Sequence, residues 1–598
     1  MSRKAVNRCR SSVAGSDVLP RTRDSAYAEL ERVDYDDEHT EDSPLLRPSH
    51  DVSIHKSYSS CGSTTKDVLI QVRDIESASV TPTTSSSITA PNPPRIGSII
   101  AVLLLGSLIS NADGSFVLAT SVSISSEFSS LQNSSWLIAS YTLAMCASQP
   151  LYGKLSDIYG RKGVLLAAYA FFGIGCAICG FAGSMGMLVL GRVVSGVGGA
   201  GMSALVSILI TDLVPLREVA KWRSYVNVAS TFGRSIGGPL GGWLTDTVGW
   251  RWSFFGQAPL TLLAAVLVYH KLPDTGSSTS EQIHRDDGSG TKPQESHRSK
   301  LTRIDFVGAA LLASTITAFL LILELGGTRL PYTSTPLMLI LLSTFVSFAL
   351  FLITESCASE PIFPLSLLCN AQVLLSYWAM LAQLAAQMGM MYLVPLYFQV
   401  TQSASTSVAG AHLLPAVVGN TVGALLTGVF IHRTGRYKLP AVSAGVVAAV
   451  TYILLILTWH GETNWIQSLF IIPGGFGTGI AQTAVFIALT SAVQKSAIAI
   501  ATSGLYLASN IGMVLGVSLT SAVLRTSLAL LLGKQDVPEE VITRVLQDVE
   551  EVQKLAEGDK MVVVGCYVHA IEYTHVLSLV LAVTAVVAGL FLRQRRIG

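Results

Sequence analysis

Three charged side chains stand inside long apolar stretches of the sequence, where a lone charge is costly. Asp113 lies about 16 residues into the first stretch, roughly 24 Å along a helix that rises about 1.5 Å per residue. Arg192 lies about six residues into the fourth stretch, which runs the opposite way, and is therefore roughly 9 Å from its own end. In an apolar layer about 30 Å thick these two depths nearly coincide, and Arg234, about 11 residues into the fifth stretch, reaches the middle.

A carboxylate within reach of one or two guanidiniums has two possible roles. It can exchange a proton or a cationic substrate, because the guanidinium keeps the charges from being stranded without a partner. It can also form a static ion pair that only holds helices together. Ionisable residues inside a membrane are costly and by default functional, so the sequence favours proton coupling or substrate binding by Asp113, Arg192 and Arg234.

The second half of the chain carries polar but uncharged residues in corresponding places. Asp113 precedes the glycine that opens a loop motif by 40 residues, and the same count before Gly428 ends beside Gln387. Gln387 is therefore the expected uncharged counterpart of Asp113. Tyr392 and Asn420 also lie within apolar stretches, and each either contacts substrate or makes a hydrogen bond between helices.

A glycine-bounded loop motif of one spacing occurs twice, which indicates an internal repeat. Each copy follows the second apolar stretch of a candidate six-helix unit, and its glycines allow a sharp turn and close packing. The first copy supplies charges of both signs and the second only basic ones. The residues concerned are Gly153, Asp157, Gly160, Arg161 and Lys162 in the first copy, and Gly428, Gly435 and Arg436 in the second.

The fifth stretch also carries a run of small residues around one proline. Small residues let helix backbones approach closely, so helix packing is the expected role of this run. Its proline adds a kink or local unwinding. The run consists of Gly237, Gly238, Pro239, Gly241 and Gly242.

Membrane-spanning helices must position all these residues. A helix needs roughly 20 residues to cross a bilayer, and we count about fourteen apolar stretches of that length. They predict an all-α integral membrane protein with six-helix bundles at 97–272 and 372–593 and two extra helices at 305–355. Bundles repeated in this way commonly hold a substrate site between them.

Composition supports this class and excludes others. Apolar residues make up 50% of the chain and charged residues 13%, against about 25% in soluble proteins. The net charge of +1 gives no reason to expect a nucleic-acid partner. No constellation of a nucleophile, a metal site or a nucleotide loop is recognisable, so we expect neither an enzyme nor a cofactor. The expected partners are the lipid bilayer, a small-molecule substrate and protons.

Basic residues predict the orientation, because they favour cytosolic loops. The loops 153–163, 215–223 and 432–438 are basic, whereas 125–135 and 460–464 contain no Lys or Arg. The basic loops and both termini are therefore expected in the cytosol.

Three polar segments interrupt the apolar pattern. Residues 1–95 are rich in Ser and Thr and are expected to be a disordered cytosolic tail. Residues 273–304 are expected to be a cytosolic linker. The loop 527–568 lies on the other side, and the spacing of its valines predicts an amphipathic helix within 536–558, with a solvated acidic loop as the alternative.

The tail also contains an acidic dileucine pattern, formed by Glu41, Leu45 and Leu46. Patterns of this form are sorting signals that direct membrane proteins to lysosome-like vacuoles. The tail is therefore expected to bind a sorting adaptor.

The motifs resemble those of the major facilitator superfamily. GKLSDIYGRKGVLL at 153–166, LGRVVSGVGGAG at 190–201 and GRSIGGPLGG at 233–242 are similar to its signatures. GWRWSFF at 249–255 and EPIFPLSLL at 360–368 are typical of its fourteen-helix drug/proton antiporter family. Within that family, the sequence motifs are most similar to those of fungal vacuolar basic amino acid transporters.

The resemblance implies roles for these residues. It implies that the loop with Asp157 and Arg161 is a latch that holds the bundles in one access state; simple positive-inside anchoring is the alternative. It places a proton-responsive carboxylate at Asp113 and couples it to Arg192. The predicted function is a proton-coupled antiporter that moves amino acids, basic ones foremost, into the vacuole. A plasma-membrane drug or toxin exporter and a transporter-like nutrient receptor are the alternatives.

Overall fold

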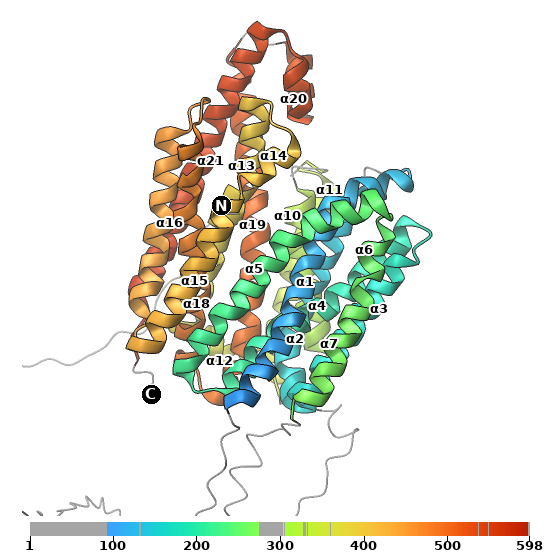
Figure 1. Ribbon diagram of the computed structural model, residues 1–598, viewed down its shortest axis with the longest axis vertical. Coiled ribbons are helices and arrows are strands. Elements are labelled where there is room, and N and C mark those ends of the chain that lie inside the picture. Colours follow the sequence, from blue (N-terminus) through green and yellow to red (C-terminus); the bar gives the residue numbers. More distant parts are fainter. Residues whose placement is uncertain are drawn as a thin grey trace, which may run out of the picture. The chain divides into compact units, whose positions relative to one another are not determined.

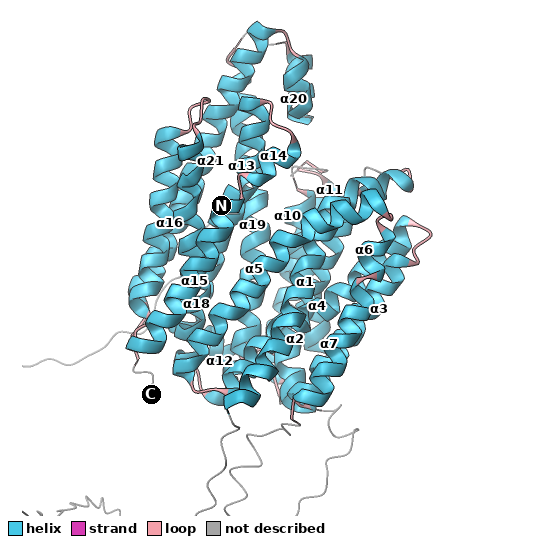
Figure 2. Cartoon of the chain, in the orientation of Figure 1, coloured by secondary structure: helices cyan, strands magenta, loops and turns pink. Residues whose placement is uncertain are grey.

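The computed structural model describes residues 93–130, 133–273, 303, 305–326, 330–331, 333–358, 360–535, 538–547 and 549–595. Within these ranges the regular elements are helices, apart from an isolated bridge between Gly326 and Leu330. Figure 2 shows this helical architecture. The all-α class predicted from the sequence is confirmed. The predicted tail, its dileucine pattern and most of the linker lie outside the described residues.

The N-terminal helices form one bundle, which we call the N-bundle. Its strongest packing is between α1 and α5, α3 and α4, α2 and α4, and α3 and α7. The helices are α1 (Pro93–Glu127), α2 (Ser135–Tyr159), α3 (Arg161–Gly180), α4 (Met185–Leu213), α5 (Leu216–Thr247), α6 (Arg251–Phe255) and α7 (Gln257–Lys271).

The C-terminal helices form a second bundle, the C-bundle. Here α13 packs against α19 and α21, α15 against α18, and α16 against α18 and α21. The α-helices are α12 (Leu365–Leu368), α13 (Ala371–Gln402), α14 (Thr406–Ala411), α15 (Leu414–Thr434), α16 (Lys438–Thr458), α17 (Trp465–Ser468), α18 (Ile472–Ala492), α19 (Ile498–Leu532) and α21 (Glu557–Phe591). Short 3₁₀ turns at Leu469–Ile471 and Lys495–Ala497 lead into α18 and α19.

Two helices between the bundles belong to neither. Of these, α10 (Phe306–Leu325) packs against both α2 and α19, and α11 (Thr335–Cys357) packs against α10. Most of the residues of α11 are exposed, as expected for a helix that faces lipid.

Twelve helices of the described chain are long and apolar enough to cross a bilayer, so the predicted count of fourteen is not confirmed. The two expected spans missing from this set are α2 and α5. Both form long helices, of 25 and 32 residues, inside the N-bundle. Their hydropathy is lower because they carry the polar residues that join the two bundles, among them Gln149, Arg223 and Asn227.

The loop after α19 contains a short helix within 536–558, as expected, but the valine pattern continues beyond its end. A helix, α20 (Glu539–Gln547), is followed by a 3₁₀ helix at Val549–Lys554. Val545 and Val552 are buried against the C-bundle, and the Tyr567 hydroxyl donates to the carbonyl of Val545 at 3.0 Å. The valine pattern therefore predicted which side chains are buried, but the α-helix ends at Gln547.

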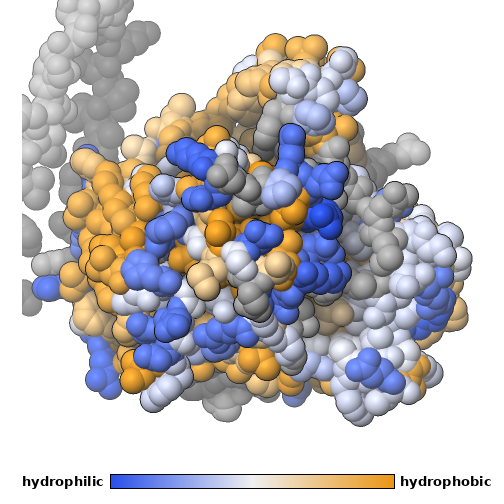
Figure 3. Space-filling view, turned by 90° about the horizontal axis from the view of Figure 1, so that it is seen from above, coloured by the Kyte–Doolittle hydropathy of each residue, from blue (hydrophilic) through white to orange (hydrophobic). Residues whose placement is uncertain are grey.

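The two bundles join near one end of their helices, which we call the basic end because the loops 153–163, 215–223 and 432–438 lie there. In Figure 1 this end is at the bottom, and the bundles spread apart toward the top. Between described residues, the hydrogen bonds that join the bundles lie from the basic end to about the middle of the helices. Figure 3 is seen from above, at the end opposite the basic end, and shows hydrophilic residues interspersed with hydrophobic ones, which also lie along the left flank.

Candidate functional site

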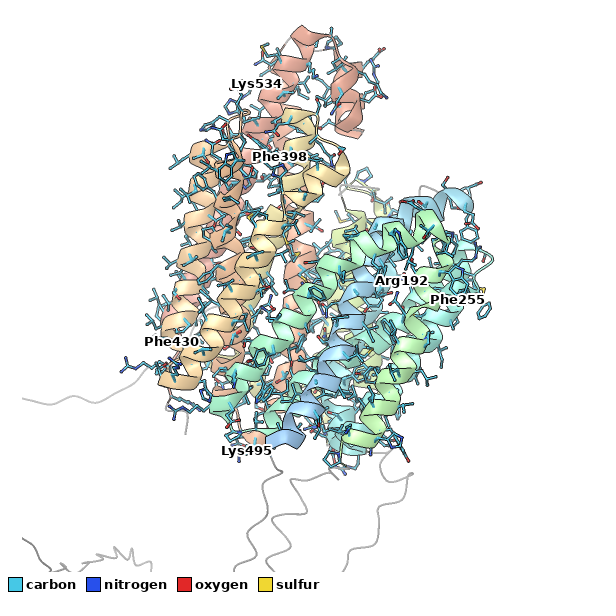
Figure 4. The ribbon with its side chains drawn as sticks, in the orientation of Figure 1. Arg192, Phe255, Phe398, Phe430, Lys495 and Lys534 are labelled. Carbon is cyan, nitrogen blue, oxygen red and sulfur yellow. The ribbon has the colours of Figure 1, made fainter. Side chains whose placement is uncertain are left out.

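A buried ion pair lies inside the N-bundle. Nη1 of Arg192 on α4 is 2.6 Å from Oδ2 of Asp113 on α1, and the side chains are 1% and 0% exposed. The equal depths inferred from the helical rise therefore correspond to a direct contact. Figure 4 places Arg192 among the N-bundle helices.

The pair has one polar atom left over. Arg192 also donates from Nε to the carbonyl of Leu137 on α2 at 3.0 Å, and its guanidinium lies 4.3 Å from the ring centre of Tyr141. Asp113 Oδ1, by contrast, has no hydrogen-bond partner among the described residues. A buried carboxylate oxygen without a donor leaves one hydrogen-bonding requirement of this pair unmet.

Arg234 does not join this pair. Its Nε donates to the carbonyl of Ser230 at 3.4 Å, and no carboxylate of the described residues forms an ion pair with it. It lies on the α5 face that carries Asn227 and Thr231, since residues three, four and seven apart share a helix face. On that face, Asn227 and Thr231 contact Asn420 of the C-bundle.

Polar side chains from both bundles meet in what we call the seam. On one side, Asn227 Nδ2 and Thr231 Oγ1 donate to Oδ1 of Asn420 on α15 at 2.9 and 3.1 Å. On the other side, Asn510 Nδ2 on α19 donates to Oε1 of Gln149 on α2 at 2.5 Å. These neutral amide pairs close the space between the bundles at about mid-height.

A buried arginine completes the seam nearer the basic end. Nη1 of Arg223 donates to Oγ of Ser207 at 2.6 Å and to the Tyr506 hydroxyl of the C-bundle at 2.5 Å. Its guanidinium also lies 4.6 Å from the ring centre of Phe486. The cation is held by hydroxyls and aromatic faces, with no carboxylate among the described residues paired with it.

The C-bundle interior contains a neutral network where the N-bundle has its ion pair. Thr478 Oγ1 donates to Oε1 of Gln387 at 3.1 Å and lies 3.3 Å from Nε2 of Gln383. Gln387 is thus buried but bound to a hydroxyl. Tyr392 is 40% exposed on α13 and takes no part in this network.

Comparison with known proteins identifies the family of this chain. The family model described as Major Facilitator Superfamily matches residues 103–517. The chain belongs to the major facilitator superfamily. It is therefore a multi-pass membrane transporter, in agreement with the motifs in its sequence.

Relatives within the superfamily have more than one cargo. A vacuolar membrane amino acid uptake transporter of Schizosaccharomyces pombe is 32% identical over 511 residues, which cover 84% of this chain and 85% of that protein. A multidrug resistance protein of the same yeast is 30% identical over 507 residues, covering 83% and 92%. The human organic anion transporter MFSD10 is similar in structure, with a TM-score of 0.53, 13% identity and coverage of 82% and 100%; at this identity the likeness concerns the fold alone.

The signature loop of the superfamily is an ion-pair cluster at the basic end. Arg161 Nη1 is 2.6 Å from Asp157 Oδ1, and its Nε is 2.9 Å from Oδ2 of Asp212 at the end of α4. Gly160 turns the chain with φ 88°, in a region that favours glycine. Lys162 lies over the ring of Tyr269 at 5.0 Å.

The second copy of the loop lacks such a cluster. Gly435 ends α15 in the left-handed conformation, with φ 66°. The backbone nitrogen of Arg436 donates to Thr434 Oγ1 at 3.2 Å. No carboxylate of the described residues pairs with Arg436, so the two copies share a turn but differ in charge.

The glycines that open the two copies lie in the seam. A Cβ on Gly153 would come within 2.9 Å of the carbonyl oxygen of Ala499, and one on Gly428 within 2.9 Å of that of Ala220. Close approach of backbones across the seam therefore requires glycine at both places.

An additional ion cluster ties the N-bundle to the segment before α12. Glu360 accepts from Lys154 at 2.9 Å and from Arg303 at 2.7 Å. Burial opposes ionisation of Glu360, but the hydrogen bonds from the two cations outweigh it and lower the pKa of this carboxyl.

The small-residue run of α5 is divided between two roles. Gly237 and Gly241 pack against Ala112 and Phe116 of α1, as expected. Gly238 and Gly242 do not, because a Cβ there would meet no atom within 4 Å, and Pro239 is exposed. The packing role predicted for Gly238 and Gly242 is therefore wrong, and the reason is that a run of glycines covers several faces of one helix.

Sequence reasoning missed part of the seam. Gln149, Ser207, Arg223, Asn227, Thr231 and Tyr506 were not singled out. The available signal was the spacing of Arg223, Asn227, Thr231 and Arg234, which lines one face of α5 with polar groups. Within the described residues, no group of three or more His, Cys, Asp or Glu side chains is arranged to hold a metal ion.

Proposed function

We propose that this protein is a proton-coupled antiporter of the vacuolar membrane that moves amino acids into the vacuole in exchange for lumenal protons. Basic amino acids are the cargo expected from the sequence. The observation that carries the proposal is the buried pair of Asp113 and Arg192, with one carboxylate oxygen left without a donor. The relative named as a vacuolar membrane amino acid uptake transporter supports the cargo and the membrane.

Proton binding to Asp113 changes how the N-bundle helices are held. The ionised carboxylate on α1 attracts Arg192 on α4, which also donates to Leu137 on α2. A proton on Asp113 removes that attraction and leaves Arg192 free to change partners. Three helices therefore respond to one protonation event, which gives the coupling between proton and bundle movement.

The seam defines one access state. It is closed at the basic end, which the positive-inside pattern assigns to the cytosol. The space between the bundles is then reached from the vacuolar lumen, where protons are supplied. The cluster of Asp157, Arg161 and Asp212 stabilises this state as a latch, and it must loosen when the basic end opens.

The proposed vacuolar location depends on the sorting pattern in the N-terminal tail. Both termini lie in the cytosol in this proposal, so the pattern of Glu41, Leu45 and Leu46 is exposed to a sorting adaptor. Replacing both leucines by alanine should move the protein from the vacuolar rim to the cell surface. Unchanged rim fluorescence of the tagged variant would remove this part of the proposal.

The test of function is uptake of radiolabelled amino acids into isolated vacuolar vesicles, with and without a proton gradient. We expect uptake that collapses when the gradient is dissipated and that is absent from vesicles lacking the protein. Equal uptake in vesicles with and without the protein would contradict amino acid transport.

The second candidate is a plasma-membrane exporter of drugs or toxins, which the multidrug resistance relative favours. It keeps the proton site and changes the cargo and the membrane. Surface localisation together with drug resistance conferred by the protein, and no vesicle uptake of amino acids, would select this candidate.

A further inference from the structure

Beyond the seam, the same face of α5 carries an arginine, Arg234, and one turn further a glycine, Gly238, with open space beside it. Arg234 follows Thr231 by one helical turn on the face directed at the C-bundle and is half-buried. Gly238 lies one turn further on the same face. A Cβ at Gly238 would meet no atom within 4 Å, so there is room beside the guanidinium of Arg234.

Helix α1 also leaves open space at this level. Gly237 packs against the backbone of Ala112, which places Gly114 of α1 at the level of Gly238. A Cβ at Gly114 would also meet no atom within 4 Å. Two neighbouring helices thus both leave side-chain volume empty at the height of Arg234.

Among the described residues, Arg234 is left without an acidic partner. In the described part of the chain, two acidic residues lie well away from helix ends, and both are engaged. Asp113 pairs with Arg192 inside the N-bundle. Glu572 accepts from His460 at 2.9 Å and from His569 at 3.0 Å, two side chains that are 59% and 66% exposed. No described carboxylate remains to neutralise Arg234.

The nearest seam groups add a donor. Asn420 Oδ1 is occupied by Asn227 and Thr231. The amide nitrogen of Asn420 has no partner in the described part of the chain and lies about one turn below Arg234. A guanidinium and an amide N–H both donate hydrogen bonds, so they suit a ligand with acceptor oxygens and negative charge.

We propose that Arg234 binds the carboxylate of the cargo in this space, with the amide of Asn420 as a second donor. This inference rests on the proposed function, because it assigns the group by which an amino acid is held. A planar guanidinium can hold a carboxylate through two parallel hydrogen bonds, which a lysine cannot do. The side chain of the cargo then points toward the open end of the space.

The first test is ligand binding to the full-length protein in detergent, read as the shift in its thermal unfolding temperature. The probes are L-lysine, L-glutamine and cadaverine, which is lysine without its carboxylate. We expect lysine and glutamine to stabilise the wild-type protein and cadaverine to have no effect at the same concentration. Stabilisation by cadaverine equal to that by lysine, or none by either amino acid, would overturn the inference.

Variants of α5 locate the effect. Arg234→Gln should weaken the binding of lysine about 10- to 100-fold, and Arg234→Lys by less, since it keeps the charge. Gly238→Leu should abolish binding while the protein stays folded, because the added side chain enters open space. Lys221→Gln removes an exposed cation from the same helix and should bind normally. Wild-type affinity in both Arg234→Gln and Gly238→Leu would overturn the inference.

Transport by the same protein in proteoliposomes separates the two claims. Carboxylate-dependent binding without proton-driven uptake would contradict the proposed function and leave the role of Arg234 in place. Proton-driven uptake that Arg234→Gln leaves unchanged would support the proposed function and overturn the role of Arg234.

Discussion

The two bundles place different chemistry at corresponding positions. The N-bundle holds Asp113 against Arg192, a buried pair of opposite charges. The C-bundle holds Gln387 against Thr478, a buried contact that is neutral at every physiological pH. The same contrast recurs at the basic end, where Arg161 has two carboxylate partners and Arg436 has none in the described chain.

In the proposed mechanism this difference is a division of labour between the two bundles. A rocking mechanism needs only one bundle to sense protons, since the other can serve as the surface against which it moves. Keeping the second bundle neutral avoids a second set of buried charges, each of which would need its own partner. Three predictions test this division and a fourth concerns the far end of α1; they follow in order of expected effect.

The largest effect should come from Asp113→Asn. An amide cannot titrate, so we expect gradient-driven uptake to be lost and the pH dependence of any residual exchange to flatten. If the pair is only structural, the same variant strands Arg192 and destabilises the protein by about 3–5 kcal/mol. Protein level and uptake are measured on the same vesicles; a well-expressed variant with full proton-driven uptake ends the coupling hypothesis.

The latch should give the next largest effect. Arg161→Ala removes the contacts with Asp157 and Asp212, so we expect a folded protein with uptake slowed roughly tenfold, about 1.4 kcal/mol in the balance of states. Arg436→Ala is the matched control in the second copy and should transport normally. Equal slowing by both substitutions would refute the asymmetry between the loops, as would normal turnover in Arg161→Ala at matched protein levels.

Gln387→Leu should act on stability and spare the coupling. It removes one acceptor of Thr478, which can still donate to the carbonyl of Gly474 at 3.0 Å. We expect a loss of about 1 kcal/mol in the free energy of unfolding and unchanged dependence of uptake on the gradient. Loss of gradient dependence would place proton sensing in the C-bundle as well.

The smallest effect concerns Glu127, at the end of α1 far from the basic end. Hydrogen bonds from Trp250 and then Arg251 lower the pKa of Glu127 below its usual 4.5. Its stabilising effect is therefore complete above pH 4.5 and is lost as the pH falls through the lowered pKa. Because the pair with Arg251 is exposed, Glu127→Gln should lower the free energy of unfolding by about 0.2–1 kcal/mol. The loss should be the same at pH 7 and at pH 5 when it is measured by thermal unfolding. A cost that differs between these pH values would contradict this.

Sequence reasoning found what depends on distance along a helix and missed what depends on direction around it. The rise per residue was enough to bring Asp113 and Arg192 together. It also placed Arg234 near the middle of α5, but depth alone could not tell that Arg234 shares a helix face with Asn227 and Thr231. The same limit explains Gly238 and Gly242, which share a motif with Gly237 and Gly241 but occupy different faces.

The fold class was predictable because long apolar helices leave few alternatives. The number of spans was harder to predict. A helix that lines a polar contact between bundles, as α5 does with Asn227 and Thr231, loses the hydropathy that identifies a span. The seam itself could not be predicted, since it joins helices that are far apart in the chain.

The position of α10 has a consequence for molecules dissolved in the membrane. The bundles meet along two lines, α2 with α19 and α5 with α15, and α10 packs on both helices of the first. Helix α10 therefore separates lipid acyl chains from the contact between α2 and α19. Among the described helices, none covers the contact between α5 and α15 in this way. A hydrophobic compound that enters sideways from the lipid must do so past α5, beside exposed Phe232 and Ile236.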